Sequence, residues 1–367
     1  MRVALDGTPL LGARTGIGRY VEGLLSGLIS SSDAPELALT AFTLRGSDAL
    51  PRLPGVDVRH RPFPARGLQA LWSHTSFPPV EWLSGRCDVF HATNFVLPPT
   101  RRAAGVLSIH DLSFLHHATT VTPTVLRYQT LVPCGIARAA VILALTETAA
   151  DEIAETYAVP RERVRVARPG VDPAWAAAAP PDDALRDELG LPARYLLFVG
   201  SVEPRKNLPD LLDALRALHA EPGLDVPPLV LAGPAGWGPP LDTAGLPPGA
   251  VHHAGYLTDE ILRRVVAGAV ALVYPSRHEG FGLPPLEALA CGTAVISSDL
   301  PVLREVTGDQ ATYVPVGDID ALGSAIAHVL TAAPDARARA ERAARAATWT
   351  WQRCAQEALT AYRLAVH

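Results

Sequence analysis

The chain has 367 residues, more than a single hydrophobic core usually contains, so its length predicts two domains. Hydrophobic residues make up 48% and charged residues 19%, and the formal net charge is −5, which excludes the strongly basic surface of a typical nucleic-acid-binding protein. The four cysteines are far apart and form no Cys-x-x-Cys pair, so a disulfide framework or a zinc site is not expected.

The apolar stretches of the chain are short. None approaches the ~20 residues that a membrane-spanning helix needs, and residues 1–5 are too few for the apolar core of a secretion signal. The predicted helix at 19–30 has few charges, so tight binding to an anionic membrane is not indicated. We expect a cytoplasmic protein with at most peripheral contact at the inner face of the membrane. The sequence does not indicate an oligomeric state.

Strands and helices alternate in the first half of the chain. A short apolar strand at 2–5 is followed by a glycine-rich turn at 12–18 and an amphipathic helix at 19–30. Further strands are predicted at 37–44, 56–60, 89–91, 105–109, 141–145 and 164–167. Helices are predicted at 122–139 and 147–157.

A linker is predicted at 173–183, where four consecutive alanines precede a proline pair. The alternation then restarts, with strands at 195–199, 228–232, 251–253, 270–274 and 294–297 and helices at 208–220, 258–267 and 284–290. This spacing predicts an α/β fold of two doubly wound parallel sheets, with ligands at the carboxyl ends of the strands. The expected domains are 1–175 and 183–345, and 346–367 is expected to be a helix that crosses back to the first domain.

The segment 278–287 has the strongest functional pattern. Pro284 suits the first turn of a helix, and the N–H groups of Phe281, Gly282 and Leu283 just before it predict an anion site whose commonest occupant is phosphate. Glu279 and Glu287 would repel a phosphate, so we expect them to reach past it to sugar hydroxyls. The alternative is that both glutamates only favour the helix dipole.

Lys206 is the only lysine among the 32 basic residues, and it follows Arg205 in a loop between a strand and a helix. An ammonium is a compact point charge, whereas a guanidinium is a wide planar fork, so the solitary lysine indicates a site that the fork does not fit. Two adjacent cations suit a diphosphate. The alternatives are chance in an arginine-rich chain and a solvated turn in which Arg205 pairs with Glu203.

Two weaker signals lie in the first half. His110 and Asp111 follow a predicted strand, where a histidine can contact a ligand, although such histidines are usually structural hydrogen-bonders. Gly16 and Gly18 form a glycine-rich turn that is not a dinucleotide-binding fingerprint.

In this order, the Gly-x-Gly turn, His110-Asp111, the Glu-Pro-Arg-Lys-Asn loop and the Glu279-x7-Glu287 pair resemble glycosyltransferase family 4 over nearly the whole chain. The resemblance implies the GT-B fold, which is two Rossmann-like domains that face a central cleft. It also implies a nucleotide-sugar donor, a retaining reaction and no metal or other cofactor. Many members have arginine where this chain has Ser201, so the phosphate charge would rest on Arg205 and Lys206.

The resemblance also implies roles for single residues. The nucleobase would lie near Tyr256 and Leu257, and Glu287 would hold the ribose hydroxyls. The implied catalytic residues are His110, Arg205, Lys206 and Glu279. The implied donor-binding residues are Gly16, Gly18, Ser201, Arg205, Lys206, Tyr256, Leu257, Glu279, Gly280, Phe281, Gly282, Leu283 and Glu287. The implied acceptor-side residues are Gly16, His110 and Asp111.

The Glu-Pro-Arg-Lys-Asn form is similar to that of bacterial family members that transfer mannose or related hexoses. We therefore expect transfer from GDP-mannose to a glycan, a lipid-linked acceptor or a small molecule. UDP- and dTDP-sugars stay open as donors. The alternatives from other classes are a sugar-nucleotide epimerase of the same fold and a non-catalytic module that binds nucleotide-sugars.

Overall fold

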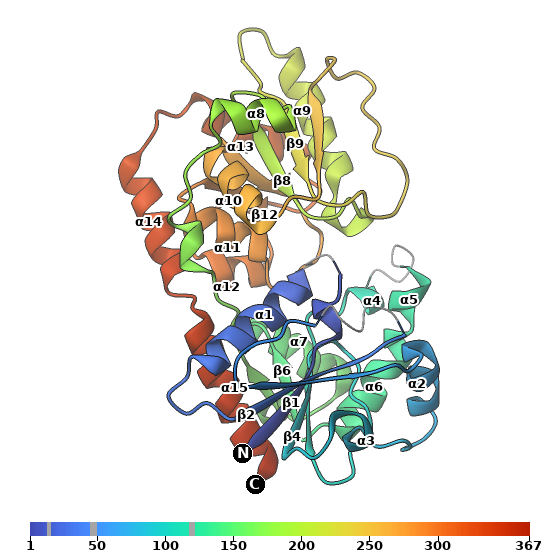
Figure 1. The fold of residues 1–367 in the computed structure, drawn as a ribbon. Coiled ribbons are helices and arrows are strands. Elements are labelled where there is room, and N and C mark those ends of the chain that lie inside the picture. The colour runs from blue at the N-terminus through green and yellow to red at the C-terminus, as the bar shows by residue number, and fades with distance from the viewer. Residues whose placement is uncertain (13–15, 45–49, 117–121) are drawn as a thin grey trace. The chain divides into compact units, whose positions relative to one another are not determined.

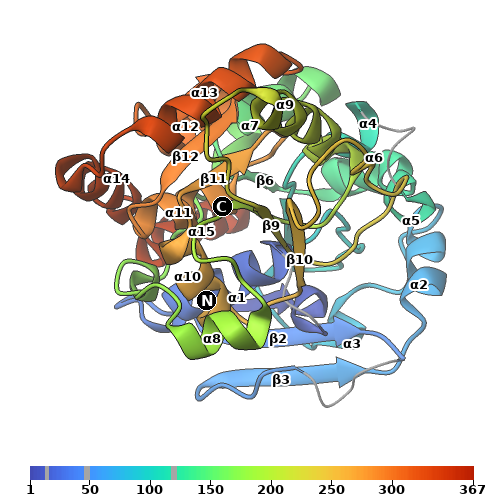
Figure 2. The same ribbon diagram turned by 90° about the horizontal axis from the view of Figure 1, so that it is seen from above.

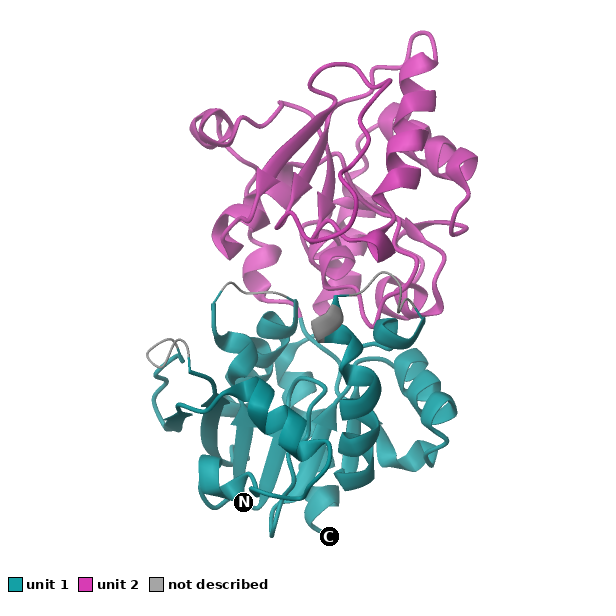
Figure 3. Ribbon diagram, turned by 90° about the vertical axis from the view of Figure 1, so that its right-hand side faces the viewer, with its two compact units in different colours: residues 1–170, 349–367 teal, residues 171–348 magenta. Residues whose placement is uncertain are grey.

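The computed structural model describes residues 1–12, 16–44, 50–116 and 122–367. Residues 13–15 of the predicted glycine-rich turn therefore lie outside the described residues. The chain divides into two compact units (Figure 3). Unit 1 comprises Met1–Gly170 and Trp349–His367, and unit 2 comprises Val171–Thr348.

Unit 1 contains a seven-stranded parallel sheet in the order β3-β2-β1-β4-β5-β6-β7 (Figures 1 and 2). The strands are β1 (Arg2–Asp6), β2 (Glu36–Phe42), β3 (Val56–Arg61), β4 (Val89–Ala92), β5 (Ala104–Ser108), β6 (Val141–Ala144) and β7 (Val164–Val166). The central strands are fully buried and mostly apolar, as expected when both faces of a parallel sheet are covered. The chain first extends from β1 towards β3 and then continues on the other side of β1, so the strand order reverses between β1 and β4.

The longer helices of unit 1 are α1 (Gly16–Ile29), α2 (Ala65–Trp72), α6 (Tyr128–Arg138), α7 (Glu147–Tyr157) and α15 (Trp351–Val366). The short ones are α3 (Glu81–Ser84), α4 (Ser113–His116) and α5 (Pro123–Leu126), with single 3-10 turns at Thr8–Leu10 and Arg161–Arg163. The single helix predicted at 122–139 is two helices, α5 and α6, divided at Arg127. The predicted glycine-rich turn also ends earlier than expected, because Gly16 and Gly18 already belong to α1.

Helix α15 returns from the far end of the chain and packs on α1 (Figure 1). Two glycines of α1 permit this close approach. A Cβ atom at Gly23 would lie 2.1 Å from the Trp351 ring, and one at Gly27 would lie 2.3 Å from the Trp351 carbonyl oxygen. Glu357 of α15 also accepts hydrogen bonds from the backbone and side chain of Arg168, both at 2.7 Å.

Unit 2 contains a six-stranded parallel sheet in the order β10-β9-β8-β11-β12-β13. The strands are β8 (Leu196–Val199), β9 (Leu229–Ala232), β10 (Val251–Gly255), β11 (Ala271–Tyr274), β12 (Ala294–Ser298) and β13 (Thr312–Val314). The helices are α8 (Asp183–Leu189), α9 (Leu208–Ala220), α10 (Asp259–Gly268), α11 (Leu283–Ala290), α12 (Pro301–Thr307), α13 (Ile319–Thr331) and α14 (Ala336–Ala347), with 3-10 turns at Pro173–Trp175 (η3) and Pro204–Lys206 (η4). The strand order reverses here between β8 and β11.

Both sheets thus have a point where the strand order reverses. In open parallel sheets, ligands bind outside the carboxyl ends of the strands at this point. The prediction of two doubly wound α/β domains is confirmed by the topology of both units. Across the described ranges, no helix is long and apolar enough to cross a membrane.

Candidate functional site

The only lysine of the chain forms a buried ion pair at the strand-order reversal of unit 2. Lys206 lies in η4, in the loop after β8, and Glu279 lies in the loop after β11. The Lys206 ammonium donates hydrogen bonds to Glu279 Oε1 and to the Tyr274 hydroxyl, both at 2.6 Å. Its nitrogen also lies 4.6 Å from the centroid of the Tyr274 ring. The lysine and the glutamate are 6% and 9% exposed, so the pair is shielded from water.

Arg205 joins the same cluster from its outer side. Its Nη1 donates to Glu279 Oε2 and to the His278 carbonyl oxygen, both at 3.1 Å, and its Nη2 donates to Glu203 Oε1 at 3.2 Å. The Ser201 hydroxyl donates to the same Glu203 oxygen at 3.1 Å. The cluster therefore holds two cations and two carboxylates, and Ser201 orients one of the carboxylates.

The electrostatics of the cluster follow from burial and from the opposite charges. Burial by itself would raise the pKa of Glu279, but Lys206 and Arg205 outweigh it and lower that pKa to about 2. Burial lowers the pKa of Lys206, and Glu279 opposes this effect. Glu279 is thus ionised at neutral pH and neutralises the cations that the sequence assigns to a diphosphate.

The N-terminus of α11 lies in the same loop as Glu279. Gly282 caps the helix with a φ of +102°, and a Cβ atom there would lie 2.6 Å from Leu303 Cδ2, so this position requires glycine. The N–H of Leu283, the first residue of the helix, has no acceptor within the helix itself, like the first N–H groups of any α-helix. Glu287 lies beyond the first turn of the helix and is 4% exposed. The helix dipole favours acidic residues mainly in the first turn, so it does not explain a buried glutamate at this position.

Tyr256 and Leu257 follow β10, two strands away from β8 in the sheet order. Tyr256 is 48% exposed and Leu257 is buried. An exposed aromatic ring at the carboxyl edge of the same sheet suits the predicted contact with a nucleobase.

In unit 1, His110 follows β5 at the carboxyl edge of the sheet, and its ring is buried. Its Nε2 lies 2.7 Å from the Thr93 carbonyl oxygen, which only accepts hydrogen bonds, so Nε2 carries the proton. Burial lowers the pKa of His110, which keeps the ring neutral and leaves a lone pair on Nδ1. The ring also makes edge contacts with Tyr20 of α1 and with Phe95. Gly16 and Gly18 lie in the first turn of α1, before Tyr20.

Asp111 also has a local role. Its Oδ1 accepts hydrogen bonds from the backbone N–H of Ser113 at 3.0 Å and from the Ser113 hydroxyl at 2.7 Å, which fixes the start of α4. The structure thus brings Lys206, Arg205, Glu279 and the start of α11 together in unit 2, and it places His110 and Asp111 side by side in unit 1.

Sequence reasoning missed several polar residues of these two edges. Tyr274 ends the strand predicted at 270–274, and its hydroxyl contacts Lys206. Asp6, the last residue of β1, begins an Asp-Gly pair that resembles an ordinary turn. Asn94 and Tyr128 belong to the same edge of unit 1, because the Asn94 side chain bonds to the Tyr128 hydroxyl. Their position after, or opposite, a strand end is the signal that could have identified them.

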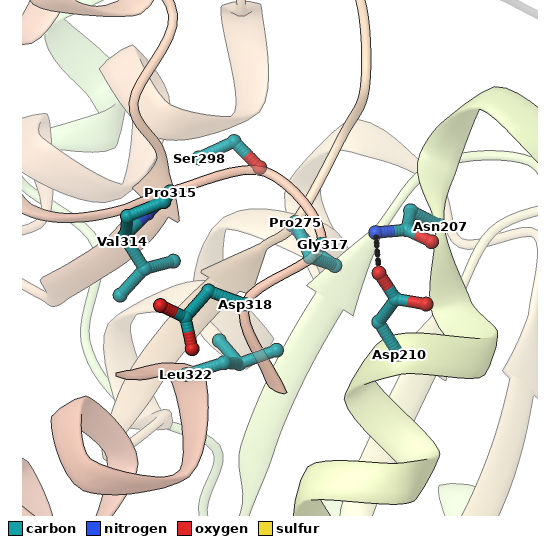
Figure 4. A pocket seen from close by; sticks show the side chains of 9 residues that line it. All are labelled: Asn207, Asp210, Pro275, Ser298, Val314, Pro315, Gly317, Asp318 and Leu322. Atoms are coloured by element: carbon teal, nitrogen blue, oxygen red, sulfur yellow. Dashed lines mark hydrogen bonds between the residues drawn. The ribbon is translucent and has the colours of Figure 1, made fainter. Parts of the chain in front are cut away.

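A small pocket lies beside the cluster in unit 2, between the start of α9 and the ends of β12 and β13 (Figure 4). Its acidic side chains already have structural partners. Asp210 accepts a hydrogen bond from Asn207 at 2.6 Å and pairs with Arg277, and Asp318 caps α13. Within the described part of the chain, no group of three or more His, Cys, Asp or Glu side chains is placed to hold a metal ion.

Comparisons with known proteins cover both units. The family described as Glycosyltransferase Family 4 matches residues 14–175, and the family described as Glycosyl transferases group 1 matches residues 193–332. O-antigen chain mannosyltransferase B of Escherichia coli is 28% identical over 400 residues, which span 99% of this chain and 100% of that protein. D-inositol 3-phosphate glycosyltransferase of Mycolicibacterium gilvum is 31% identical over 78% of this chain and 65% of its own length.

Among solved structures, sucrose-phosphate synthase of Thermosynechococcus elongatus has a similar fold. Its TM-score is 0.74 with 19% identity, and the match covers 99% of this chain and 98% of that one. This likeness shows the two-domain GT-B architecture that the sequence predicts.

Proposed function

Because the chain belongs to glycosyltransferase family 4, and is therefore a glycosyltransferase, we propose that it transfers mannose from GDP-mannose with retention of the anomeric configuration. The acceptor is a hydroxyl of a glycan, a lipid-linked sugar or a small molecule. The choice of mannose is supported by the O-antigen mannosyltransferase that matches along its full length. UDP- and dTDP-sugars are the alternative donors.

The observation that carries the proposal is the buried cluster of Lys206, Arg205 and Glu279. Removing charges from water is costly, and a buried ion pair contributes little to stability compared with an apolar core. A cluster of this kind at the strand-order reversal is therefore better explained by a ligand than by folding. A diphosphate at this place would take the two cations as partners and release Glu279 to accept hydrogen bonds from sugar hydroxyls.

The same groups account for catalysis. When the bond between the sugar and the diphosphate breaks, negative charge grows on the leaving oxygens. Lys206, Arg205 and the N–H groups at the start of α11 stabilise this charge more in the transition state than in the ground state. No further carboxylate of the cluster is free to act as a nucleophile, because Glu203 is held by Arg205 and Ser201. We therefore propose attack by the acceptor on the face that the leaving group departs from. His110 hydrogen-bonds the transferred sugar.

Transfer by this scheme requires no metal, because the two cations and the helix N–H groups supply the positive charge. An epimerase and a non-catalytic binding module are the competing functions. An epimerase would convert the donor without an acceptor, and a binding module would hold the donor unchanged.

The test is an assay of the purified protein with GDP-mannose, UDP-glucose, UDP-galactose and dTDP-glucose. A thermal-shift screen first identifies the nucleotide that raises the melting temperature, since a ligand that binds only the folded state stabilises it. Mass spectrometry then detects transfer to an added acceptor, and NMR determines the anomeric configuration of the product. An inverted product contradicts the retaining scheme, and turnover without an acceptor favours the epimerase.

A further inference from the structure

The carboxyl edge of unit 1 carries a second group of polar side chains at the reversal of strand order. Asp6 ends β1, Asn94 follows β4, and His110 and Asp111 follow β5, and these three strands are neighbours in the sheet. The reversal falls between β1 and β4, which is where an open parallel sheet binds its ligand. The Thr93 hydroxyl donates to the Asp6 carbonyl oxygen at 2.6 Å and ties the two strand ends together.

Three hydrogen-bond acceptors in this group have no donor in the described part of the chain. Asp6 uses only Oδ1, which accepts from the Thr8 N–H at 2.9 Å and from the Thr8 hydroxyl at 2.6 Å, so Oδ2 is open. Asn94 Oδ1 is buried and has no partner. The His110 ring is 6% exposed, and its Nδ1 has a lone pair but no donor within the described residues. A buried acceptor without a donor, such as Asn94 Oδ1, is rare and calls for a ligand or water that supplies one.

An aromatic surface borders these acceptors. The rings of Phe95 and Tyr128 stack with centroids 4.7 Å apart, and Phe114 packs edge-on against both. Burial raises the pKa of the Tyr128 hydroxyl, and the nearby carboxylates of Asp6 and Asp111 raise it further, against the opposing effect of Arg127. Phe95 also packs edge-on against His110, so Tyr128 of α6 lies beside the same group of acceptors.

We propose that Asp6, Asn94 and Tyr128 form the subsite for the acceptor, and that this subsite takes an uncharged sugar residue and rejects a phosphorylated one. The inference rests on the proposed function and adds the class of acceptor to it. A sugar ring has hydroxyl donors for the open oxygens of Asp6 and Asn94, and an apolar C–H face for the rings of Phe95 and Tyr128. A phosphate here would face the carboxylates of Asp6 and Asp111, which repel it.

The inference separates two kinds of acceptor that the names of similar proteins suggest. One relative is named for an inositol phosphate, and another for the assembly of an O-antigen chain. The acidic edge of unit 1 favours a sugar of the second kind, such as the neutral end of a growing chain. Arg127 lowers the pKa of the Tyr128 hydroxyl, and the carboxylates of Asp6 and Asp111 raise it, so two acids act against one cation at this hydroxyl.

The experiment compares matched pairs of acceptors that differ only in a phosphate. The wild-type protein is assayed, with its donor, on mannose against mannose 6-phosphate, on glucose against glucose 6-phosphate, and on myo-inositol against inositol 3-phosphate. We expect a kcat/KM at least tenfold higher for the neutral member of the pair that is used best. Equal or better transfer to the phosphorylated member overturns the inference.

Two variants test the residues themselves. Asp6→Asn keeps the size of the side chain, and Tyr128→Phe keeps the ring stack. We expect each to raise the KM for the neutral acceptor at least tenfold and to leave the affinity for GDP unchanged. Asp6→Asn should also reduce the ratio of kcat/KM for the neutral acceptor to kcat/KM for the phosphorylated one. The matched control is Glu155→Gln, an exposed acid-to-amide change on α7 of the same unit.

The controls separate failure of this inference from failure of the proposed function. If no nucleotide-sugar binds and none is consumed, the proposed function itself is wrong. If the donor binds and is transferred or hydrolysed, but the Asp6→Asn and Tyr128→Phe variants keep the wild-type acceptor KM, only the acceptor subsite is wrong. Circular dichroism and melting temperature identify a variant that does not fold. In that case the neutral-against-phosphorylated comparison on the wild-type protein decides alone.

Discussion

Lys206 Nζ lies 2.6 Å from Glu279 Oε1, although the two residues are 73 positions apart in the sequence. The same ammonium lies 2.6 Å from the Tyr274 hydroxyl. A compact charge with three donors fits this buried corner, whereas a planar guanidinium needs more room and different partners. The pair gives the single lysine of the chain a physical role.

Lys206→Arg should lower kcat by about 10²–10³-fold, which is the usual effect of removing one donor that stabilises a developing negative charge. The measurement is the initial rate at saturating donor, and circular dichroism checks that the fold is kept. The control is Arg337→Lys, which makes the reverse substitution at an exposed position on α14. This variant should keep the wild-type rate. Wild-type turnover in Lys206→Arg would mean that the lysine stands there by chance.

Glu279→Gln should bind GDP more tightly and turn over more slowly. The carboxylate competes with the diphosphate for Lys206 and Arg205, so its removal frees both cations for the ligand. The same change should destabilise the unliganded protein by about 3–5 kcal/mol, because it leaves buried charge uncompensated. Calorimetry measures the affinity, and urea denaturation measures the stability. Weaker GDP binding in this variant would contradict the competition.

Acid should destabilise the protein partly through Glu279. Its pKa is about 2 in the folded chain, below the ordinary value of 4.5, so the folded state favours the ionised form. The contribution is fully present above about pH 5 and is lost as the pH falls towards 2. Melting temperatures between pH 7 and pH 3 should therefore fall less steeply for Glu279→Gln than for the wild type. Parallel pH profiles for the two proteins would remove Glu279 as a source of acid sensitivity.

Glu287→Gln should weaken nucleotide binding through the ribose. In the proposed role, Glu287 accepts hydrogen bonds from the ribose hydroxyls, so the loss of affinity should be about tenfold for GDP and absent for 2′,3′-dideoxy-GDP. Titration calorimetry with both nucleotides makes the comparison. Glu341→Gln, on the α14 surface, serves as the control. An equal loss for both nucleotides would indicate a structural effect of the buried carboxylate instead.

Transfer should continue in the presence of EDTA, because Lys206, Arg205 and the N–H groups at the start of α11 supply the positive charge. The measurement is the rate of transfer after dialysis against the chelator, compared with the rate after addition of Mg²⁺ or Mn²⁺. A loss of activity that either ion restores would show that the reaction depends on a metal.

The fold was predictable from local patterns. The predicted bounds of the helix at 147–157 agree with those of α7, because the Thr146 hydroxyl caps its first turn and Ala158 ends it in the left-handed conformation. The buried strands are short apolar runs between turns, so the alternation of strands and helices was visible throughout. The division at Arg127 was not visible, because neither a glycine nor a proline marks that position.

The candidate site was only partly predictable. The sequence indicates that Arg205, Lys206 and Glu279 lie at strand ends, and the structure places them there. It does not indicate that Glu279 holds both cations, because that contact depends on how two distant loops meet above the sheet. Asp6 was missed for another reason. An Asp-Gly pair after a strand has the composition of an ordinary turn, and only the reversal of strand order beside it distinguishes this position.

The return of α15 to α1 determines the order in which the protein is able to fold. Unit 1 buries Cys354, Leu359 and Tyr362 of this helix, and the Tyr362 hydroxyl lies 2.7 Å from Nδ1 of the buried His91. During synthesis, all of unit 2 leaves the ribosome before these residues do. The sequence of unit 2 is therefore complete before that of unit 1, although the synthesis of unit 1 begins earlier. Until α15 has been synthesised, the first 170 residues lack the helix that covers part of their apolar core.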